Sequence, residues 1–423
     1  MKRTAMAIAT LCFAACGEPA PAPAIQQFAD EWLFTGMLED LDSEGAGTVN
    51  LHETAGELRG WYAAQGRTSP LRNIERTDTS LSFMVMSNGG RLAVDKQDDG
   101  TWVGHWNYPG ASKALRASFT PVDQPPASAA RLASEMVQLP DGRRMHVVCS
   151  GEGSPVVLLD YGAGGTMKRD WGDIAQLAAE KAQTKVCAYD RAGRGLSDPA
   201  ATPRDTAAVA DDIDAILTAA NLPPPYILVG HSLGSYHVRQ FANTRADKTA
   251  GLVLVDPSGD GQLERFNAVI PKVQKMQDEM FKAQAELQCI TRLREKPVAP
   301  DDPFAQQCGG NDPEALSATK SEIEEMPGAS TQQLLASRRS YGAMPVIVLT
   351  RGDYDKDMPP EFTTEDRAAM KSVWEGLHAE MAALSTAGEQ RHVAGAGHYI
   401  QRDNPEAVLT AIADVVAKVR QTP

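Results

Sequence analysis

The sequence has 423 residues, which is too many for one average domain and suits two. Hydrophobic residues make up 42% of the chain and charged residues 23%, close to the values of ordinary globular proteins. The formal net charge of -14 argues against a nucleic-acid-binding protein that depends on contacts with phosphates.

The amino terminus has the pattern of an export signal. Two basic residues precede an apolar run over residues 5–15, which is too short to cross a bilayer as a helix. We therefore predict a signal peptide over residues 1–15. Small residues directly before Cys16 resemble a bacterial lipobox, which implies a lipid on Cys16 and a place in the periplasm or on the outer membrane. Simple cleavage near Ala15 is the alternative, and the Pro/Ala-rich residues 16–24 are typical of an extended tether.

Residues 25–121 are predicted to form a small β domain. Alternating apolar positions occur at residues 49–51, 81–85 and 92–94, and turn clusters rich in Gly, Asn and Asp separate them. Such short, closely spaced strands favour an antiparallel meander or a small barrel. Four of the six tryptophans are assigned to the core of this domain, with a ligand-binding surface as the alternative: Trp32, Trp61, Trp102 and Trp106. Residues 122–128, which include adjacent prolines, are a predicted linker.

Residues 129–423 alternate between predicted strands and predicted helices, which favours a mostly parallel, doubly wound sheet. Short apolar, β-branched runs predict strands at residues 143–149, 155–160, 185–189, 226–230, 251–255, 346–349 and 391–393. Helical periodicity predicts helices at residues 173–182, 205–220 and 404–420. Residues 258–344 carry helical stretches and no strand pattern. We therefore expect a helical cap there, with a surface decoration as the alternative.

Residues 230–234 read Gly-His-Ser-Leu-Gly and lie between a predicted strand and a helical pattern. In that context a G-x-S-x-G motif holds its serine on a sharp turn with the hydroxyl exposed, because the glycines let the backbone pass close on both sides. Ser232 is therefore the candidate nucleophile. The amide of Leu233, at the start of the helix, would face a developing oxyanion. An incidental serine in an ordinary strand–loop–helix connection is the alternative.

Three motifs in this order give the second domain a family resemblance. Residues 189–195 read Tyr-Asp-Arg-Ala-Gly-Arg-Gly, residues 228–234 read Leu-Val-Gly-His-Ser-Leu-Gly, and residues 397–401 read Gly-His-Tyr-Ile-Gln. Over roughly its last two thirds, the chain resembles a bacterial branch of the α/β-hydrolase superfamily. The resemblance implies the α/β-hydrolase fold and the hydrolysis of esters, amides or thioesters by acyl transfer. It also implies that Asp190 and Arg191, in the first motif, are structural.

A serine hydroxyl is a weak nucleophile until a base removes its proton. His398, in a loop after the last predicted strand, takes the position of the superfamily's base. A carboxylate must then orient the imidazole and stabilise its charged form. Asp256 is the favoured acid, because the branch that the chain resembles has a Val-Asp-Pro-Ser pattern after the strand that follows the nucleophile helix. Asp355 is the first alternative, because many superfamily members carry the acid after the strand at residues 346–349, and Asp353 is the second.

An oxyanion hole needs two amide donors. Beside Leu233, the second donor would come from the loop after Asp160, where residues 161–165 read Tyr-Gly-Ala-Gly-Gly and resemble the superfamily's His-Gly-x turn. Ala163 is the expected donor, and Gly162 is the next candidate. A phosphate cradle is disfavoured because the loop lacks the Gly-x-Gly-x-x-Gly order. The resemblance implies no metal and no organic cofactor.

Four of the six cysteines lie beyond the signal and Cys16, and disulfides are possible in an exported chain. In the fold that the resemblance implies, Cys149 and Cys187 lie on neighbouring antiparallel strands, so a disulfide between them is expected, with two buried thiols as the alternative. Cys289 and Cys308 could likewise staple the cap. No pair in the body of the chain has the close spacing of a zinc site.

Together these features predict an exported, lipid-anchored serine hydrolase that cleaves a carboxylic ester, as an esterase or lipase does, and takes a small-molecule acyl substrate. A small amide or peptide hydrolase of the same fold is one alternative. A catalytically inert binding lipoprotein, whose β domain recognises a partner, is another. No nucleic-acid partner is expected.

Overall fold

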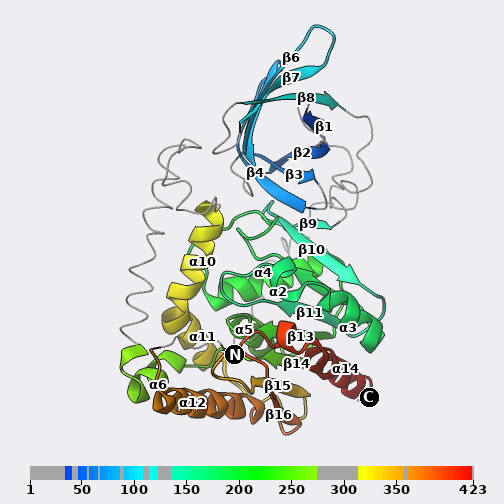
Figure 1. The fold of residues 1–423 in the computed structure, drawn as a ribbon. Helices are drawn as coiled ribbons and strands as arrows, with labels where there is room; N and C mark the ends of the chain where they lie inside the picture. The colour runs from blue at the N-terminus through cyan, green and yellow to red at the C-terminus, as the bar shows by residue number, and fades with distance from the viewer. Residues whose placement is uncertain are drawn as a thin grey trace, which may run out of the picture.

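The structure, a computed structural model, describes residues 34–40, 46–54, 57–64, 67–85, 90–107, 114–121, 135–273, 313–356 and 361–421. The described chain forms a β-barrel followed by a mostly parallel sheet that helices cover (Figure 1). The predicted signal peptide, Cys16, the tether and the linker lie outside these residues, as do Cys289 and Cys308. Within the described ranges, no helix is long and apolar enough to cross a membrane.

The first eight strands form a closed antiparallel barrel, in which each strand pairs with the next and β1 pairs with β8. The strands are β1 (Phe34–Asp40), β2 (Ala46–Thr54), β3 (Glu57–Ala64), β4 (Arg67–Arg76), β5 (Ser80–Val85), β6 (Gly90–Lys96), β7 (Trp102–Asn107) and β8 (Leu115–Pro121). Of the two predicted arrangements, the barrel is therefore the one observed. Closure pairs the two edge strands that a meander would expose.

Alternate residues of the barrel strands face its interior, as the two-residue period of a strand requires. In β5, Leu81, Phe83 and Val85 are buried while the residues between them are partly exposed. Trp102 and Trp106 belong to the same buried cluster. The assignment of these two tryptophans to the core of the small domain is confirmed.

Trp61 is buried in a different place, on the outer side of the barrel. Its neighbour Tyr62 packs against the interior cluster, and alternation turns Trp61 the other way. The guanidinium of Arg144, a residue of the second domain, lies 5.7 Å from the centroid of the Trp61 ring. Trp61 is therefore a contact between the barrel and the second domain. Trp32 lies outside the described residues.

The second domain contains an eight-stranded sheet in the order β16-β15-β14-β13-β11-β12-β10-β9. Its strands are β9 (Met136–Gln138), β10 (Arg144–Ser150), β11 (Val156–Asp160), β12 (Val186–Tyr189), β13 (Tyr226–His231), β14 (Thr249–Val255), β15 (Val346–Arg351) and β16 (Gly388–Val393). Only the pairs made by β10, with β9 and with β12, are antiparallel. The predicted doubly wound sheet is confirmed, and β9 is an additional strand at its edge.

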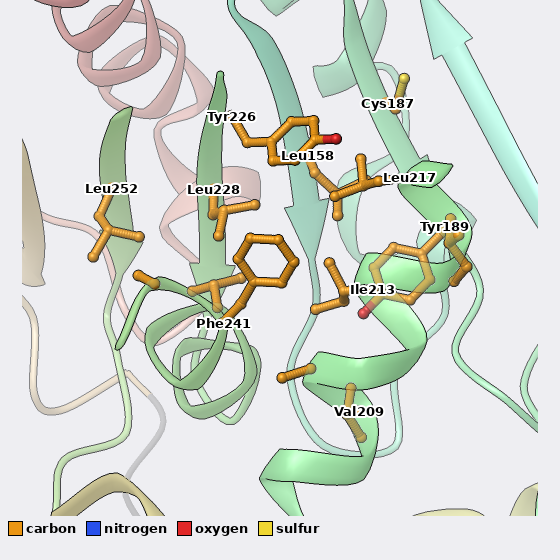
Figure 2. Packing of buried hydrophobic residues seen from close by; sticks show 14 of the residues in the cluster. Leu158, Cys187, Tyr189, Val209, Ile213, Leu217, Tyr226, Leu228, Phe241 and Leu252 are labelled. Carbon is orange, nitrogen blue, oxygen red and sulfur yellow. The ribbon is translucent and has the colours of Figure 1, made fainter. Parts of the chain in front are cut away.

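Helices cover both faces of this sheet. They are α2 (Met167–Trp171), α3 (Ile174–Ala182), α4 (Thr206–Ala219), α5 (Gly234–Thr244), α12 (Thr364–Ala382), α13 (Ile400–Asp403) and α14 (Pro405–Gln421). One buried cluster joins the sheet to α4, α5 and α12, and a second joins its other face to α3 and α14. Figure 2 shows the Phe241 ring of α5 between Leu228 of the sheet and Ile213 of α4. Alternate side chains of each central strand thus enter opposite layers.

The described part of the predicted cap is helical: α6 (Gln262–Val269), α10 (Pro313–Glu325), η1 (Met326–Ser330) and α11 (Thr331–Ser337). No helix is predicted for residues 364–382, yet α12 occupies them. A capping box starts this helix, because the side chains of Thr363 and Asp366 each accept a hydrogen bond from the other's backbone amide. Its buried residues lie in the second half, so the first half gives little helical periodicity.

The structure joins Cys149 of β10 and Cys187 of β12 in a disulfide. The two residues are direct partners in the antiparallel register, and their Cα atoms lie 4.0 Å apart. Directly opposed residues in an antiparallel pair come close enough for their sulfur atoms to bond. This is the pairing expected for these two cysteines.

Replacing both Cys149 and Cys187 with alanine is expected to lower the free energy of unfolding in urea by about 2–4 kcal/mol, because the disulfide restricts the unfolded chain. The number of thiols that titrate in denaturant without a reductant should equal that of the wild type, since both sulfurs are already bonded. A loss of two titratable thiols in the variant would contradict the disulfide.

Candidate active site

Ser232 lies on a sharp turn between β13 and α5, at the carboxyl end of the central parallel strands. Its φ is 51°, a left-handed conformation that is costly for a residue with a side chain. The flanking glycines are required by space. A Cβ on Gly230 would lie 2.7 Å from Val238, and one on Gly234 would lie 2.6 Å from the carbonyl oxygen of Tyr161. Close packing on both sides therefore holds the serine in this strained conformation.

Two further side chains form a hydrogen-bonded series with Ser232. His398, in the loop between β16 and α13, has its Nε2 atom 3.0 Å from the Ser232 hydroxyl oxygen. Its Nδ1 atom is 2.6 Å from a carboxylate oxygen of Asp256, which directly follows β14. This is the geometry of a base that can take the serine proton and an acid that orients the base. The three residues favoured from the sequence thus form one series, in which His398 is within hydrogen-bond distance of both Ser232 and Asp256.

Asp256 is fully buried, and donors besides His398 surround its carboxylate. The backbone amide of Arg351 donates to Oδ1 at 3.0 Å and the indole of Trp374 at 2.9 Å, while Arg351 Nε lies 2.8 Å from Oδ2. Burial alone would raise the pKa of Asp256, but the hydrogen bond from His398 and the charge of Arg351 outweigh it. They hold the pKa of this carboxyl well below its usual range, so the group is ionised at neutral pH.

Neither alternative acid is bonded to His398 within the described part of the chain. The Asp355 side chain is largely exposed and lies 3.2 Å from Arg367. Asp353 accepts hydrogen bonds from the amides of Asp355 and Lys356, which makes it a local turn residue. Asp355 therefore points its carboxylate to the surface, and Asp353 points its carboxylate to the backbone of its own turn.

Arg351 and Trp374 are parts of the site that the sequence reasoning did not identify. Arg351 is the last residue of β15, and its Nη2 atom lies 3.2 Å from Nδ1 of His398. Its guanidinium lies 4.7 Å from the centroid of the Trp374 ring. The place of Arg351 at the carboxyl end of a strand beside β14 could have indicated it. Trp374 comes from α12, a helix that the sequence reasoning did not predict.

His231, the second residue of the serine motif, supports the His398 loop. Its Nε2 atom donates to the backbone carbonyl of His398 at 3.0 Å, and the centroids of the two imidazole rings lie 4.8 Å apart. Burial, with a contribution from His398, lowers the pKa of His231 to about 3. A neutral His231 therefore ties the nucleophile turn to the loop that carries the base.

The loop after β11 lies against the serine. A Cβ on Gly162 would be only 3.2 Å from the Cβ of Ser232. The amides of Leu233 and Ala163, the predicted oxyanion donors, donate no hydrogen bond to another described group. Among the described residues neither N–H group has an acceptor, and both lie on segments that flank Ser232. Both could therefore donate to an oxyanion that forms beside the serine.

Asp190 has a structural role, as the resemblance implies. Its carboxylate accepts hydrogen bonds from the amide of Met167 and from Nδ1 of His146, each at 3.0 Å. Burial alone would lower the pKa of His146, but Asp190 and Glu135 outweigh it and raise the pKa to about 9. This is an ion-pair cluster, and the described residues include no group of three or more His, Cys, Asp or Glu side chains that could hold a metal ion.

A buried acid, a histidine and a serine on a strand–turn–helix, all at the carboxyl edge of a doubly wound sheet, define an α/β-hydrolase arrangement. The sequence model of the alpha/beta hydrolase family matches residues 147–411, which is more than half of the chain. The chain belongs to the alpha/beta hydrolase family.

The chain is also similar to several known proteins. The uncharacterized protein YqjL of Bacillus subtilis (strain 168) is 26% identical over 266 residues, which cover 62% of this chain and 85% of that protein. Among solved structures, an epoxide hydrolase, CorEH, is 19% identical with a TM-score of 0.46 and covers 67% of this chain and 98% of its own. A thermophilic esterase from Thermogutta terrifontis is 23% identical with a TM-score of 0.43 over the same shares of the two chains.

Proposed function

We propose that this chain is an exported serine hydrolase that cleaves a carboxylic ester through an acyl-enzyme on Ser232. The observation that carries the proposal is the hydrogen-bonded series from the buried carboxylate of Asp256 through His398 to the Ser232 hydroxyl. Membership of the alpha/beta hydrolase family supports hydrolytic chemistry. The basic residues, apolar run and Cys16 at the amino terminus support export and a lipid anchor.

In the first half of the reaction, Nε2 of His398 takes the hydroxyl proton while the Ser232 oxygen forms a bond to the acyl carbon. The amides of Leu233 and Ala163 stabilise the negative oxygen of the tetrahedral intermediate. The bond from the acyl carbon to the alcohol oxygen then breaks, and His398 gives its proton to that oxygen. The ionised Asp256 stabilises the imidazolium while His398 carries the proton.

In the second half, water attacks the acyl carbon of the acyl-enzyme, and His398 takes a proton from the water. The bond between the acyl carbon and the Ser232 oxygen breaks, His398 returns the proton to that oxygen, and the carboxylic acid leaves. The free enzyme is restored, and water is the only co-substrate.

A fluorophosphonate probe is expected to label the wild-type protein, because an activated serine attacks the phosphorus as it would attack an acyl carbon. The same protein should hydrolyse p-nitrophenyl esters faster than aminoacyl p-nitroanilides. Absence of both labelling and hydrolysis would overturn the proposed enzymatic activity, and a preference for the anilides would indicate an amide hydrolase.

The lipid anchor is tested separately. In fractionated bacterial cells the labelled band should sediment with membranes, and Cys16→Ser should move it to the soluble fraction.

A further inference from the structure

Arg191 is fully buried in the turn after β12, and every N–H group of its guanidinium donates a hydrogen bond. Its Nε and Nη2 atoms donate to the two carboxylate oxygens of Glu322 at 2.9 and 2.8 Å. Nη1 donates to Asp160 Oδ1 and to the carbonyl of Tyr161, both at 2.7 Å, and Nη2 also donates to the carbonyl of Gly162 at 3.0 Å. These bonds employ all five N–H groups of an arginine side chain, so Arg191 is fixed in a single orientation.

Two of those acceptors belong to the loop that lies against Ser232. The carbonyl of Gly162 and the N–H of Ala163 are in the same planar peptide group and point in opposite directions. Arg191 and the amide of Gly165 hold the Gly162 carbonyl on one side of the loop. The Ala163 N–H must therefore point to the other side, away from the guanidinium. A hydrogen bond to a carbonyl thus sets the direction of the neighbouring donor.

The other end of this network lies in the cap. Glu322 is a buried residue of α10, so its bidentate pair with Arg191 joins the cap to the loop. Arg194 makes a parallel connection, because it donates to the carbonyls of Gly164 and Gly165 and also to the Thr319 hydroxyl of α10. Two arginines of one turn therefore fasten the loop and the cap helix to each other.

The buried guanidinium of Arg191 and the buried carboxylates around it neutralise one another. Asp160, at the end of β11, is fully buried and also accepts a hydrogen bond from Nδ1 of His237 at 2.7 Å. Burial alone would lower the pKa of Arg191, but Glu322 and Asp160 outweigh it and raise the pKa well above its usual range. Loss of the guanidinium would leave two buried carboxylates without their main partner.

We propose that Arg191 is a positioning residue for the oxyanion hole, which orients the Gly162–Ala163 peptide and is itself anchored by Glu322 of the cap. This inference rests on the proposed function, because it gives the Ala163 amide a task in catalysis. It assigns to the turn at residues 189–195 a specific effect on the transition state. It also makes the docking of α10 a condition for an ordered oxyanion hole.

The test compares Arg191→Lys and Glu322→Gln with Arg239→Lys, a matched control. Arg239 is equally buried and makes a bidentate pair with Asp260 at 2.9 and 2.7 Å, but it does not bond to the oxyanion loop. For a p-nitrophenyl ester, kcat is expected to fall about 10- to 100-fold in Arg191→Lys with little change in KM. A misdirected oxyanion donor stabilises the transition state less but leaves the binding of the substrate unchanged. Glu322→Gln should show a smaller fall, and Arg239→Lys should keep the wild-type kcat.

A trifluoromethyl ketone provides the second readout, because its adduct with Ser232 places an oxyanion in the hole. Its affinity should fall by the same factor as kcat in each variant. The inference is overturned if Arg191→Lys and Glu322→Gln keep the wild-type kcat, or if kcat falls while the ketone binds as before. If Arg191→Lys does not fold, Glu322→Gln decides by the same criteria. Failure of the proposed function is distinct, because the wild type itself would then be neither labelled nor active.

Discussion

Replacing Ser232 with alanine is expected to lower kcat for a p-nitrophenyl ester by about 10⁶-fold and to abolish fluorophosphonate labelling. Alanine has no oxygen to attack the acyl carbon, and His398 then has no hydroxyl proton to take. His398→Ala should lower kcat by a similar factor. The double variant should be no slower than either single variant, because the two residues act as one unit. Steady-state hydrolysis, with labelling of the same preparations, measures all three.

Ser385→Ala is the control for the loss of a buried serine hydroxyl. Ser385 donates to the carbonyls of Met344 and Gly342, near the amino end of β15. Ser232 lies at the other end of the parallel strands, where their carboxyl ends meet. This variant should unfold at a lower temperature but keep the wild-type kcat. A Ser232→Ala protein that still labels, or that hydrolyses the ester at the rate of Ser385→Ala, would contradict the assignment of the nucleophile.

Ser232 and His398 could be predicted because each lies in a local pattern. The serine needs a strand, a tight turn between two glycines and a helix, and all three are written in consecutive residues. The close contacts that a Cβ would make at Gly230 and Gly234 explain why glycine stands at both positions. The doubly wound sheet is predictable for a similar reason, because each of its central strands is a short apolar run.

The acid could be ranked but not fixed from the sequence, because two strands end near each other at the same edge of the sheet. Which carboxylate reaches the imidazole depends on side-chain packing around the ends of β14 and β15. In the structure, Trp374 and Arg351 enclose the carboxylate of Asp256, and Asp355 faces solvent. Trp374 is 118 residues from Asp256, so no local spacing could show this contact.

Closure of the barrel and the network around Arg191 also depend on distant pairs. The barrel closes because β1 pairs with β8, a register that alternation within single strands does not specify. Arg191 and Glu322 are separated by 131 residues, with part of the cap between them. The resemblance marks Arg191 as structural, and only its partners reveal that it holds the loop beside the nucleophile.

Replacing Asp256 with asparagine is expected to lower kcat by about 10⁴-fold while the fold is kept. An asparagine side chain has nearly the same shape but carries no charge, so it cannot stabilise the imidazolium that forms when His398 takes the serine proton. Its amide can also donate to Nδ1, which favours the wrong tautomer of the histidine. The loss should be large because the carboxylate is fully buried and bonded to Nδ1 at 2.6 Å, where no water can replace it. Steady-state hydrolysis of a p-nitrophenyl ester measures the effect.

Asp355→Asn and Asp353→Asn are the matched controls, since each makes the same chemical change in the loop usually expected to carry the acid. Asp355 is paired with Arg367 at the surface, and Asp353 caps its own turn, so both variants should keep a kcat within about threefold of the wild type. A larger loss in Asp355→Asn than in Asp256→Asn would mean that the loop after β15 delivers the acid. The contacts that the amide and side chain of Arg351 make with Asp256 would then stabilise the fold only and would have no role in catalysis.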